Sequence, residues 1–143
     1  MKIMVSACLT GLNVKYNGGN NLSAEFMKFA EGQKIIPVCP ESLGGLKAPR
    51  PPAEIVDGRV MNKEGVSVDR EFRAGAEKVL EIAKKEQPDL IVLQSRSPSC
   101  GVNNIYDGSF TGKLKSGSGV TAELLIKNGF KVIDIEDLPS IEK

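Results

Sequence analysis

The stretch Leu90-Ile91-Val92-Leu93 is an unbroken run of apolar residues that follows Pro88 and precedes a polar segment. Such a short, continuous run is typical of a strand buried on both faces, as in a parallel sheet covered by helices. Three other short apolar stretches are expected to be strands as well, namely Ile3–Ala7, Lys34–Val38 and Lys131–Ile135. Pro37 cannot donate a ladder hydrogen bond, so its strand is expected at an edge or near its own end.

Helices are expected between these strands. The clearest pattern begins at Asp69, which can cap a helix, and runs to about Glu86, with apolar residues recurring at helical spacing. Shorter helices are expected after Ser23, which can also act as a cap, and over Val120–Asn128. This alternation predicts the α/β class: a single three-layer Rossmann-like domain over residues 1–143 with a mostly parallel sheet.

Three segments depart from the alternation. The stretch Ile55–Met61 predicts a small β-hairpin insertion, because Asp57-Gly58 favours a tight turn between its two halves. The segments Pro40–Pro52 and Ser95–Gly119 are rich in Gly, Pro and Ser and are predicted to be loops. Loops that follow strands often carry functional residues, so these two are candidates for the site.

The composition excludes several classes of function. A net charge of +1 over 143 residues gives no electrostatic reason to expect binding to nucleic acid or to a membrane. Neither a signal peptide nor a membrane span is apparent, so we expect a cytoplasmic protein in which disulfides are rare. Histidine is absent, which excludes Ser-His and Cys-His catalysis and leaves acid–base chemistry to carboxylates, lysine, tyrosine or hydroxyls.

The three cysteines, Cys8, Cys39 and Cys100, each stand at or just beyond the end of a predicted strand. The carboxyl ends of parallel strands share one edge of a sheet, so these thiols are expected to converge there. No Cys-x-x-Cys pair is present, and a free cysteine is often only a small buried apolar residue. Judged together, three thiols at one edge favour a metal ion or a cluster over a disulfide.

Several motifs around these cysteines resemble those of the thiouracil desulfurase family, a small family long catalogued as a domain of unknown function. The resemblance extends from residue 6 to residue 122, which is most of the chain. The motifs that carry it are Ser6-Ala7-Cys8-Leu9, Val38-Cys39-Pro40-Glu41, Ser97-Pro98-Ser99-Cys100-Gly101, Ile105–Phe110 and Gly119–Ala122.

The resemblance implies a [4Fe-4S] cluster held only by Cys8, Cys39 and Cys100. Three ligands leave one of the four irons open, and a soft iron site favours the sulfur of a thiocarbonyl substrate. The implied reaction replaces the sulfur of a thiolated nucleobase, or of a similar small molecule, by oxygen without net electron transfer. The three ligand sulfurs should then lie on the order of 6–7 Å apart.

Two polar residues are candidates for catalysis. Glu41 follows Cys39 by two residues and could exchange protons with the substrate or with water, although it could also be a solvated loop residue or a helix-cap partner. Ser97 could hydrogen-bond to the substrate or to water. Its alternative role is a local turn within Ser97-Pro98-Ser99.

Two further residues are candidates for substrate binding. Arg50, between two prolines, could hold a carbonyl oxygen or an anionic substrate, or could instead pair with Glu54 or Asp57 to brace its loop. Tyr16 lies in a Gly-rich segment and could line the pocket, or could simply pack over the core.

Two other classes of function stay open at this point. One is a non-catalytic module in which the three thiolates and water, or Glu41, hold zinc. The other is a thiol-redox sensor that uses one exposed cysteine. A small thiolated molecule is the expected partner, and the sequence leaves open whether the chain forms a homodimer.

Overall fold

The central sheet has four parallel strands in the order β2-β1-β5-β8 in the computed structural model, which describes residues 1–140. The strands are β1 (Lys2–Ser6), β2 (Lys34–Val38), β5 (Leu90–Leu93) and β8 (Val132–Asp134). In the shared register, Val5 of β1 faces both Pro37 of β2 and Val92 of β5. The four predicted strands are confirmed, and so is the edge position of the strand that contains Pro37.

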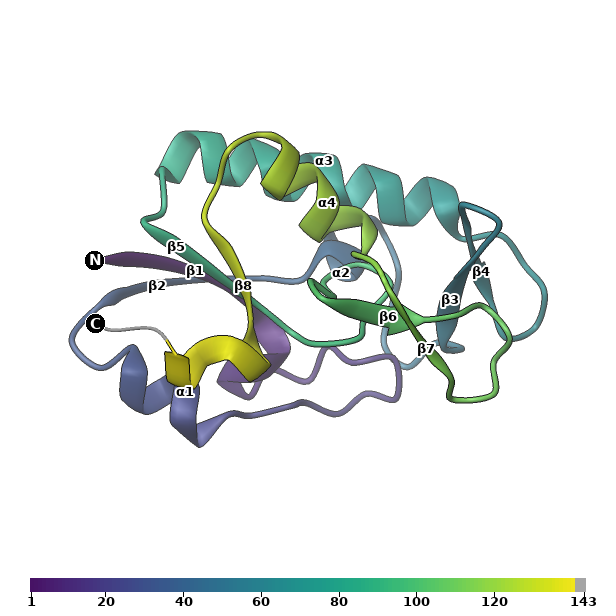
Figure 1. Ribbon diagram of the computed structural model, residues 1–143, viewed down its shortest axis with the longest axis horizontal. Coiled ribbons are helices and arrows are strands. Elements are labelled where there is room, and N and C mark those ends of the chain that lie inside the picture. Colours follow the sequence, from purple (N-terminus) through teal and green to yellow (C-terminus); the bar gives the residue numbers. More distant parts are fainter. Residues whose placement is uncertain (141–143) are drawn as a thin grey trace.

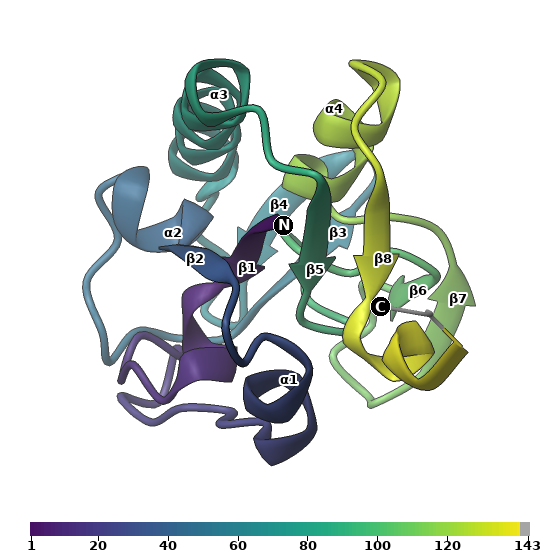
Figure 2. The same ribbon diagram turned by 90° about the vertical axis from the view of Figure 1, so that its left-hand side faces the viewer.

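Helices cover both faces of the sheet (Figures 1 and 2). The helices α3 (Asp69–Glu86) and α4 (Val120–Lys127) lie on one face, and α1 (Ala24–Phe29) lies on the other. The predicted three-layer α/β arrangement is therefore confirmed. Each strand alternates its side chains between two cores: Met4 and Ile91 pack with α3 and α4, whereas Ile3 and Val5 pack with α1. Burial on both faces explains the unbroken apolar runs.

The two predicted helix caps have different outcomes. Ser23 caps α1, since its hydroxyl accepts a hydrogen bond from the backbone N–H of Phe26 at 3.0 Å. The prediction for Asp69 is wrong, because Val68 occupies the cap position of α3. Asp69 is the first helical residue, and its carboxylate accepts a hydrogen bond from the N–H of Val60 at 3.0 Å. That bond ties the start of α3 to the neighbouring hairpin.

Two hairpins stand at the end of the sheet toward which its strands point (Figure 1). The predicted hairpin is confirmed as β3 (Ala53–Val56) and β4 (Arg59–Asn62), which pair antiparallel. A second hairpin, β6 (Asn104–Tyr106) and β7 (Leu114–Ser116), lies within the segment predicted to be a loop. Its strands have three residues each, and β7 is exposed throughout, so the sequence carries no alternating pattern there. The chain also contains the 3-10 helices η1 (Ala7–Thr10) and η2 (Ile135–Ser140).

The other predicted loop, Pro40–Pro52, begins with the short helix α2 (Pro40–Leu43). A helix of four residues is too short to show apolar periodicity, which is why the sequence did not predict it. It packs on α3 with the two backbones almost in contact. A Cβ atom at Gly75 would lie 1.8 Å from the carbonyl oxygen of Pro40, and one at Gly44 would lie 1.9 Å from that of Glu71. This close approach fixes the position of the residues that follow β2.

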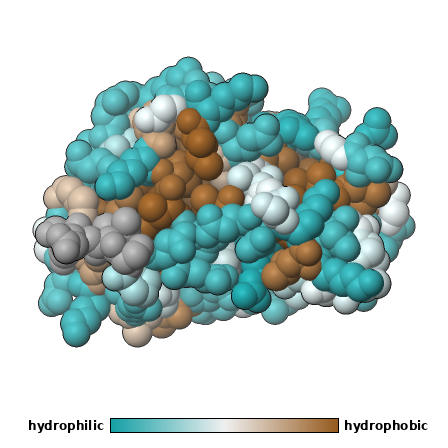
Figure 3. Space-filling view, viewed as in Figure 1, coloured by the Kyte–Doolittle hydropathy of each residue, from teal (hydrophilic) through white to brown (hydrophobic). Residues whose placement is uncertain are grey.

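Apolar side chains also gather on the surface beside α4 and β8 (Figure 3). Ile126 of α4 is 44 % exposed, and Phe130 and Val132 are partly buried against the core that α3 and α4 cover. The possible homodimer stays an open question. No helix within residues 1–140 combines the length and the apolar character that crossing a membrane requires.

Candidate functional site

A cavity of about 530 Å³ lies at the carboxyl ends of the sheet strands. All seven residues singled out from the sequence line this cavity: Cys8, Cys39, Cys100, Glu41, Ser97, Arg50 and Tyr16. They come from segments far apart in the chain, and the parallel sheet brings those segments together. The expected convergence of the three cysteines on one edge is therefore observed. Their role as ligands stays a prediction.

Each cysteine is positioned by the element that follows its strand. Cys8 lies in η1, directly after β1. Cys39 is the cap residue of α2, and its sulfur accepts a hydrogen bond from the N–H of Ser42 at 3.5 Å. Cys100 lies in the segment after β5 and is only 4 % exposed. None of the three forms a disulfide.

The turn that carries Cys100 is held by the start of α4. The N–H of Val120 donates to the carbonyl of Pro98 at 2.8 Å, and the N–H of Thr121 donates to that of Ser99 at 2.9 Å. Gly119 permits the contact, because a Cβ atom there would lie 2.5 Å from the carbonyl carbon of Ser99. The first N–H groups of a helix have no acceptor within the helix, and here the carbonyl groups of the turn are their acceptors.

Burial dominates the acid–base properties of two of the thiols. It raises the pKa of Cys8, although the side-chain amide of Asn21, 3.7 Å from the sulfur, acts in the opposite direction. It raises the pKa of Cys100 to about 12, against the lowering effect of the hydroxyls of Ser6 and Ser99. The negative charge of Glu41 adds to both increases. Both thiols are therefore protonated at neutral pH unless a cation is bound nearby.

The chemistry of the donor set suits an iron–sulfur cluster. Within residues 1–140, no group of three or more Cys, Asp or Glu side chains is arranged to hold a single metal ion. Three soft sulfur donors around one cavity, with no histidine in the chain, suit iron in a sulfide cluster.

Glu41 lies at the centre of a polar network beside the cysteines. Its Oε1 accepts hydrogen bonds from Nε and Nη2 of Arg50 at 3.3 and 3.1 Å, and its Oε2 accepts one from the hydroxyl of Ser99 at 2.9 Å. The side chains of Arg50 and Glu41 are only 9 % and 18 % exposed. Glu41 is thus not a solvated loop residue.

Arg50 braces its loop, but through partners other than those expected. The sequence suggested Glu54 or Asp57, and that suggestion is wrong, because the ion pair is with Glu41. The guanidinium also donates to the carbonyl oxygens of Val14 at 2.9 Å and Lys47 at 3.3 Å. An arginine can satisfy several acceptors at once through its planar fork of N–H groups.

Ser97 forms the local turn that was its alternative role. Its oxygen accepts hydrogen bonds from the N–H groups of Ser99 and Cys100, each at 3.1 Å, and it still lines the cavity. Ser99 is the residue that sequence analysis missed. It is fully buried, and its hydroxyl lies 2.9 Å from both Glu41 Oε2 and Ser97 Oγ, and 3.6 Å from Cys100 Sγ. Its place next to Cys100 in the chain was the one available signal.

Tyr16 lies at the rim of the cavity and is 43 % exposed. Its carbonyl oxygen accepts a hydrogen bond from the N–H of Arg50 at 2.6 Å, which joins the two loops that carry the candidate substrate-binding residues. The cavity wall also includes Lys15, Lys63, Arg96, Tyr106, Phe110 and Glu54.

The fold and the site together define an α/β protein whose cysteine-lined cavity opens at the carboxyl edge of a parallel sheet. The chain belongs to the 2-thiouracil desulfurase family, which it matches over residues 3–137. Family membership makes the protein an enzyme of the desulfurase type and confirms the resemblance found in the sequence motifs.

Two similar proteins agree with this placement. The chain is 39 % identical over 149 residues to the uncharacterized protein YbbK of Bacillus subtilis (strain 168), an alignment that covers 97 % of this chain and 99 % of YbbK. A solved structure of TudS, a [4Fe-4S]-dependent thiouracil desulfidase, superimposes with a TM-score of 0.90 at 38 % identity. That match covers 97 % of this chain and 93 % of TudS.

Proposed function

We propose that this enzyme replaces the sulfur of a thiolated nucleobase, or of a similar thiocarbonyl small molecule, by oxygen from water. In this proposal Cys8, Cys39 and Cys100 hold a [4Fe-4S] cluster. The observation that carries it is the convergence of all three cysteines on one cavity that Glu41 also lines. The likeness to TudS, a [4Fe-4S]-dependent thiouracil desulfidase, supports the choice of cofactor and substrate class.

A bound cluster with three thiolate ligands would supply one iron free of protein ligands, a soft Lewis acid for the substrate's sulfur. The overall change converts a C=S group and water into a C=O group and hydrogen sulfide. It moves protons but no net electrons, so the protein must supply proton transfer and orientation.

Glu41 is the proposed general acid–base residue. Its carboxylate takes a proton from the attacking water and returns one to a ring nitrogen or to the leaving sulfur. Arg50 on Oε1 and Ser99 on Oε2 fix the direction in which its remaining lone pairs point. Ser97 is proposed to orient the water or the substrate from the cavity wall.

Arg50 and Tyr16, the two proposed substrate-binding residues, differ in how free their side chains are to contact a ligand. Tyr16 offers a ring at the cavity rim and has room for a ligand beside it. The guanidinium of Arg50 already donates hydrogen bonds to Glu41 and to two backbone carbonyls. Its main contribution to the reaction is therefore to orient Glu41.

The cluster is tested by anaerobic reconstitution of the wild type and of Cys8→Ser, Cys39→Ser and Cys100→Ser. We expect a brown wild-type protein with about four irons per chain. Each variant should lose most of its iron and its desulfurisation of 2-thiouracil. Val66→Ala, at an exposed position outside the cavity, is the control that should behave as wild type. A colourless, zinc-loaded wild type would instead favour the zinc-binding module.

The role of Glu41 is tested separately by Glu41→Gln, which keeps the shape but cannot carry the proton. We expect full iron loading and a fall in kcat of about 10²–10⁴-fold, the usual loss for a general acid–base residue. Glu25→Gln on the exposed face of α1 is the matched control. Normal turnover by Glu41→Gln would assign the proton transfer elsewhere, and loss of iron would make Glu41 a ligand.

A further inference from the structure

The tip of the β6–β7 hairpin holds an aromatic side chain at the cavity in an unusual backbone conformation. Phe110 lines the cavity, and its φ angle is 58°, in the left-handed region. A bulky residue other than glycine is rarely found there, because the conformation costs about 1–2 kcal/mol. Backbone strain of this kind persists only where surrounding contacts enforce it, and it is concentrated at functional sites.

The contacts that enforce it come from β3. Oε1 of Glu54 accepts hydrogen bonds from the N–H of Phe110 at 3.1 Å and from that of Gly108 at 3.0 Å. Glu54 is 9 % exposed, so a carboxylate is buried mainly to hold this loop. A Cβ atom at Gly108 would lie 2.6 Å from the carbonyl oxygen of Ile55, so the loop rests directly on the β3 backbone.

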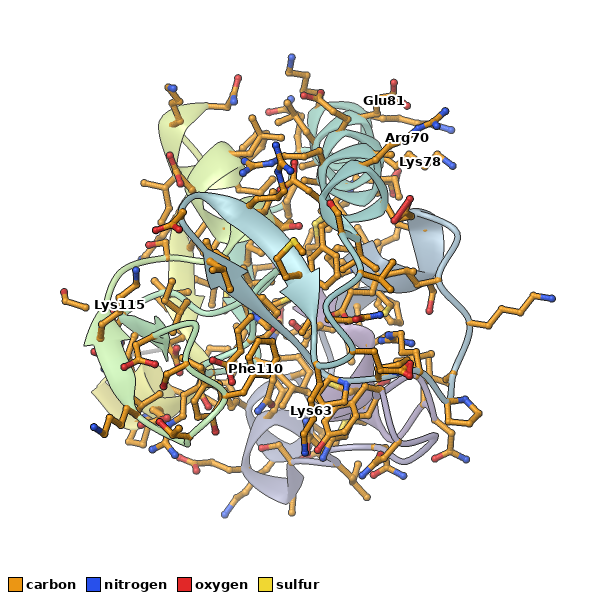
Figure 4. All side chains as sticks on the ribbon, turned by 90° about the vertical axis from the view of Figure 1, so that its right-hand side faces the viewer. Lys63, Arg70, Lys78, Glu81, Phe110 and Lys115 are labelled. Atoms are coloured by element: carbon orange, nitrogen blue, oxygen red, sulfur yellow. The ribbon has the colours of Figure 1, made fainter. Side chains whose placement is uncertain are left out.

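Phe110 differs from its two chain neighbours in the direction of its side chain. Ser109 and Thr111 are exposed, and their hydroxyls lie 2.6 Å apart, whereas Phe110 is half-buried and faces the cavity. Figure 4 looks onto this end of the molecule and shows Phe110 together with Lys63, which lines the same cavity. The apolar ring therefore borders the cavity that also contains the cysteines.

We propose that Phe110 is the surface on which the planar ring of the substrate packs, and that Glu54 is the positioning residue that keeps it there. This inference rests on the proposed function, because it takes a thiolated heterocycle as the substrate. Aromatic rings stack on nucleobases without needing a particular base, so the contact favours flat, ring-shaped thiocarbonyl compounds over acyclic ones. The β3–β4 hairpin then has a role in substrate selection.

The test compares 2-thiouracil with thiourea, which has the C=S group but no ring. Phe110→Leu keeps an apolar side chain and removes the aromatic face. We expect its KM for 2-thiouracil to rise about 10-fold with kcat nearly unchanged, and its kcat/KM for thiourea to stay at the wild-type value. Leu114→Ala on the same hairpin, outside the cavity, is the control that should change neither.

Glu54 is tested with two variants. Glu54→Ala removes the acceptor and should reproduce the rise in KM for 2-thiouracil. Glu54→Gln keeps an acceptor oxygen at that position, so its KM should stay close to the wild-type value. Iron loading is measured in every sample, and binding of uracil is followed by calorimetry without turnover. The inference would be overturned if Phe110→Leu lost kcat/KM equally for 2-thiouracil and thiourea, or if it bound uracil as tightly as the wild type. A wild type that binds uracil but removes no sulfur would instead overturn the proposed function.

Discussion

Ser99 and Glu41 are joined by a hydrogen bond of 2.9 Å although 58 positions separate them in the chain. The Ser99 hydroxyl has one proton, so when it donates to Glu41 the hydroxyl of Ser97, also 2.9 Å away, must donate to Ser99. This places Glu41, Ser99 and Ser97 in one chain of hydrogen bonds that ends at the cavity wall.

The first prediction concerns the link itself. Ser99→Ala should leave one carboxylate oxygen of Glu41 without its partner and lower kcat by about 10–100-fold, since a hydrogen bond to a charged group contributes about 1.5–3 kcal/mol. Iron loading should stay complete, because the cysteines are untouched. The control is Ser118→Ala, which removes a hydroxyl bonded to the carbonyl of Val102 outside the cavity. Unchanged kcat in Ser99→Ala would make its bond to Glu41 purely structural.

A second prediction tests whether Arg50 stabilises its loop or binds the substrate. Arg50→Met removes the cation from a largely buried ion pair, and we expect the free energy of unfolding to fall by about 3 kcal/mol. Arg50→Lys, which keeps the charge but loses the planar fork, should lose less. Urea denaturation measures both. If stability is unchanged while KM for 2-thiouracil rises, Arg50 acts on the substrate and not on its loop.

A third prediction addresses the contact between α2 and α3. Alanine is a better helix former than glycine, yet Gly75→Ala would place a methyl group 1.8 Å from the carbonyl oxygen of Pro40. We expect a loss of about 2–3 kcal/mol in unfolding free energy together with reduced iron loading, because α2 carries Glu41 and is capped by Cys39.

The control for that variant is Ala74→Gly, at the neighbouring exposed position of α3. It should cost about 1 kcal/mol through helix propensity alone, with iron loading at the wild-type level. Equal iron loading in Gly75→Ala and the wild type would contradict the proposed effect on Cys39.

A fourth prediction concerns pH. Burial raises the pKa of Asp134 above 3.8, so the folded state holds this proton more tightly than the unfolded chain. Its contribution to stability is therefore complete below about pH 3.8 and is lost as the pH rises through the raised value. Asp134→Asn should show a smaller loss of unfolding free energy than the wild type over that range, measured by urea denaturation at successive pH values. An identical pH dependence would contradict it.

The sequence determined the scaffold and the convergence of the cysteines. Unbroken apolar runs such as Leu90–Leu93 require burial on both faces, and helical periodicity identified α3, with only its cap residue misplaced by one position. Since parallel strands end at one edge, the positions of Cys8, Cys39 and Cys100 along the chain were enough to bring them to one cavity.

Two features were decided only by the tertiary structure. They are the elements that are too short to show a periodic sequence pattern and the hydrogen-bond partners of the polar side chains. Helix α2 has four residues and β7 three, fewer than a periodicity needs, so they form because α3 and the opposing strand hold them. The bonds of Glu41 to Arg50 and Ser99, and of Glu54 to Phe110, depend on the distances between separate loops. Those distances follow from how the layers pack, which no local pattern of residues encodes.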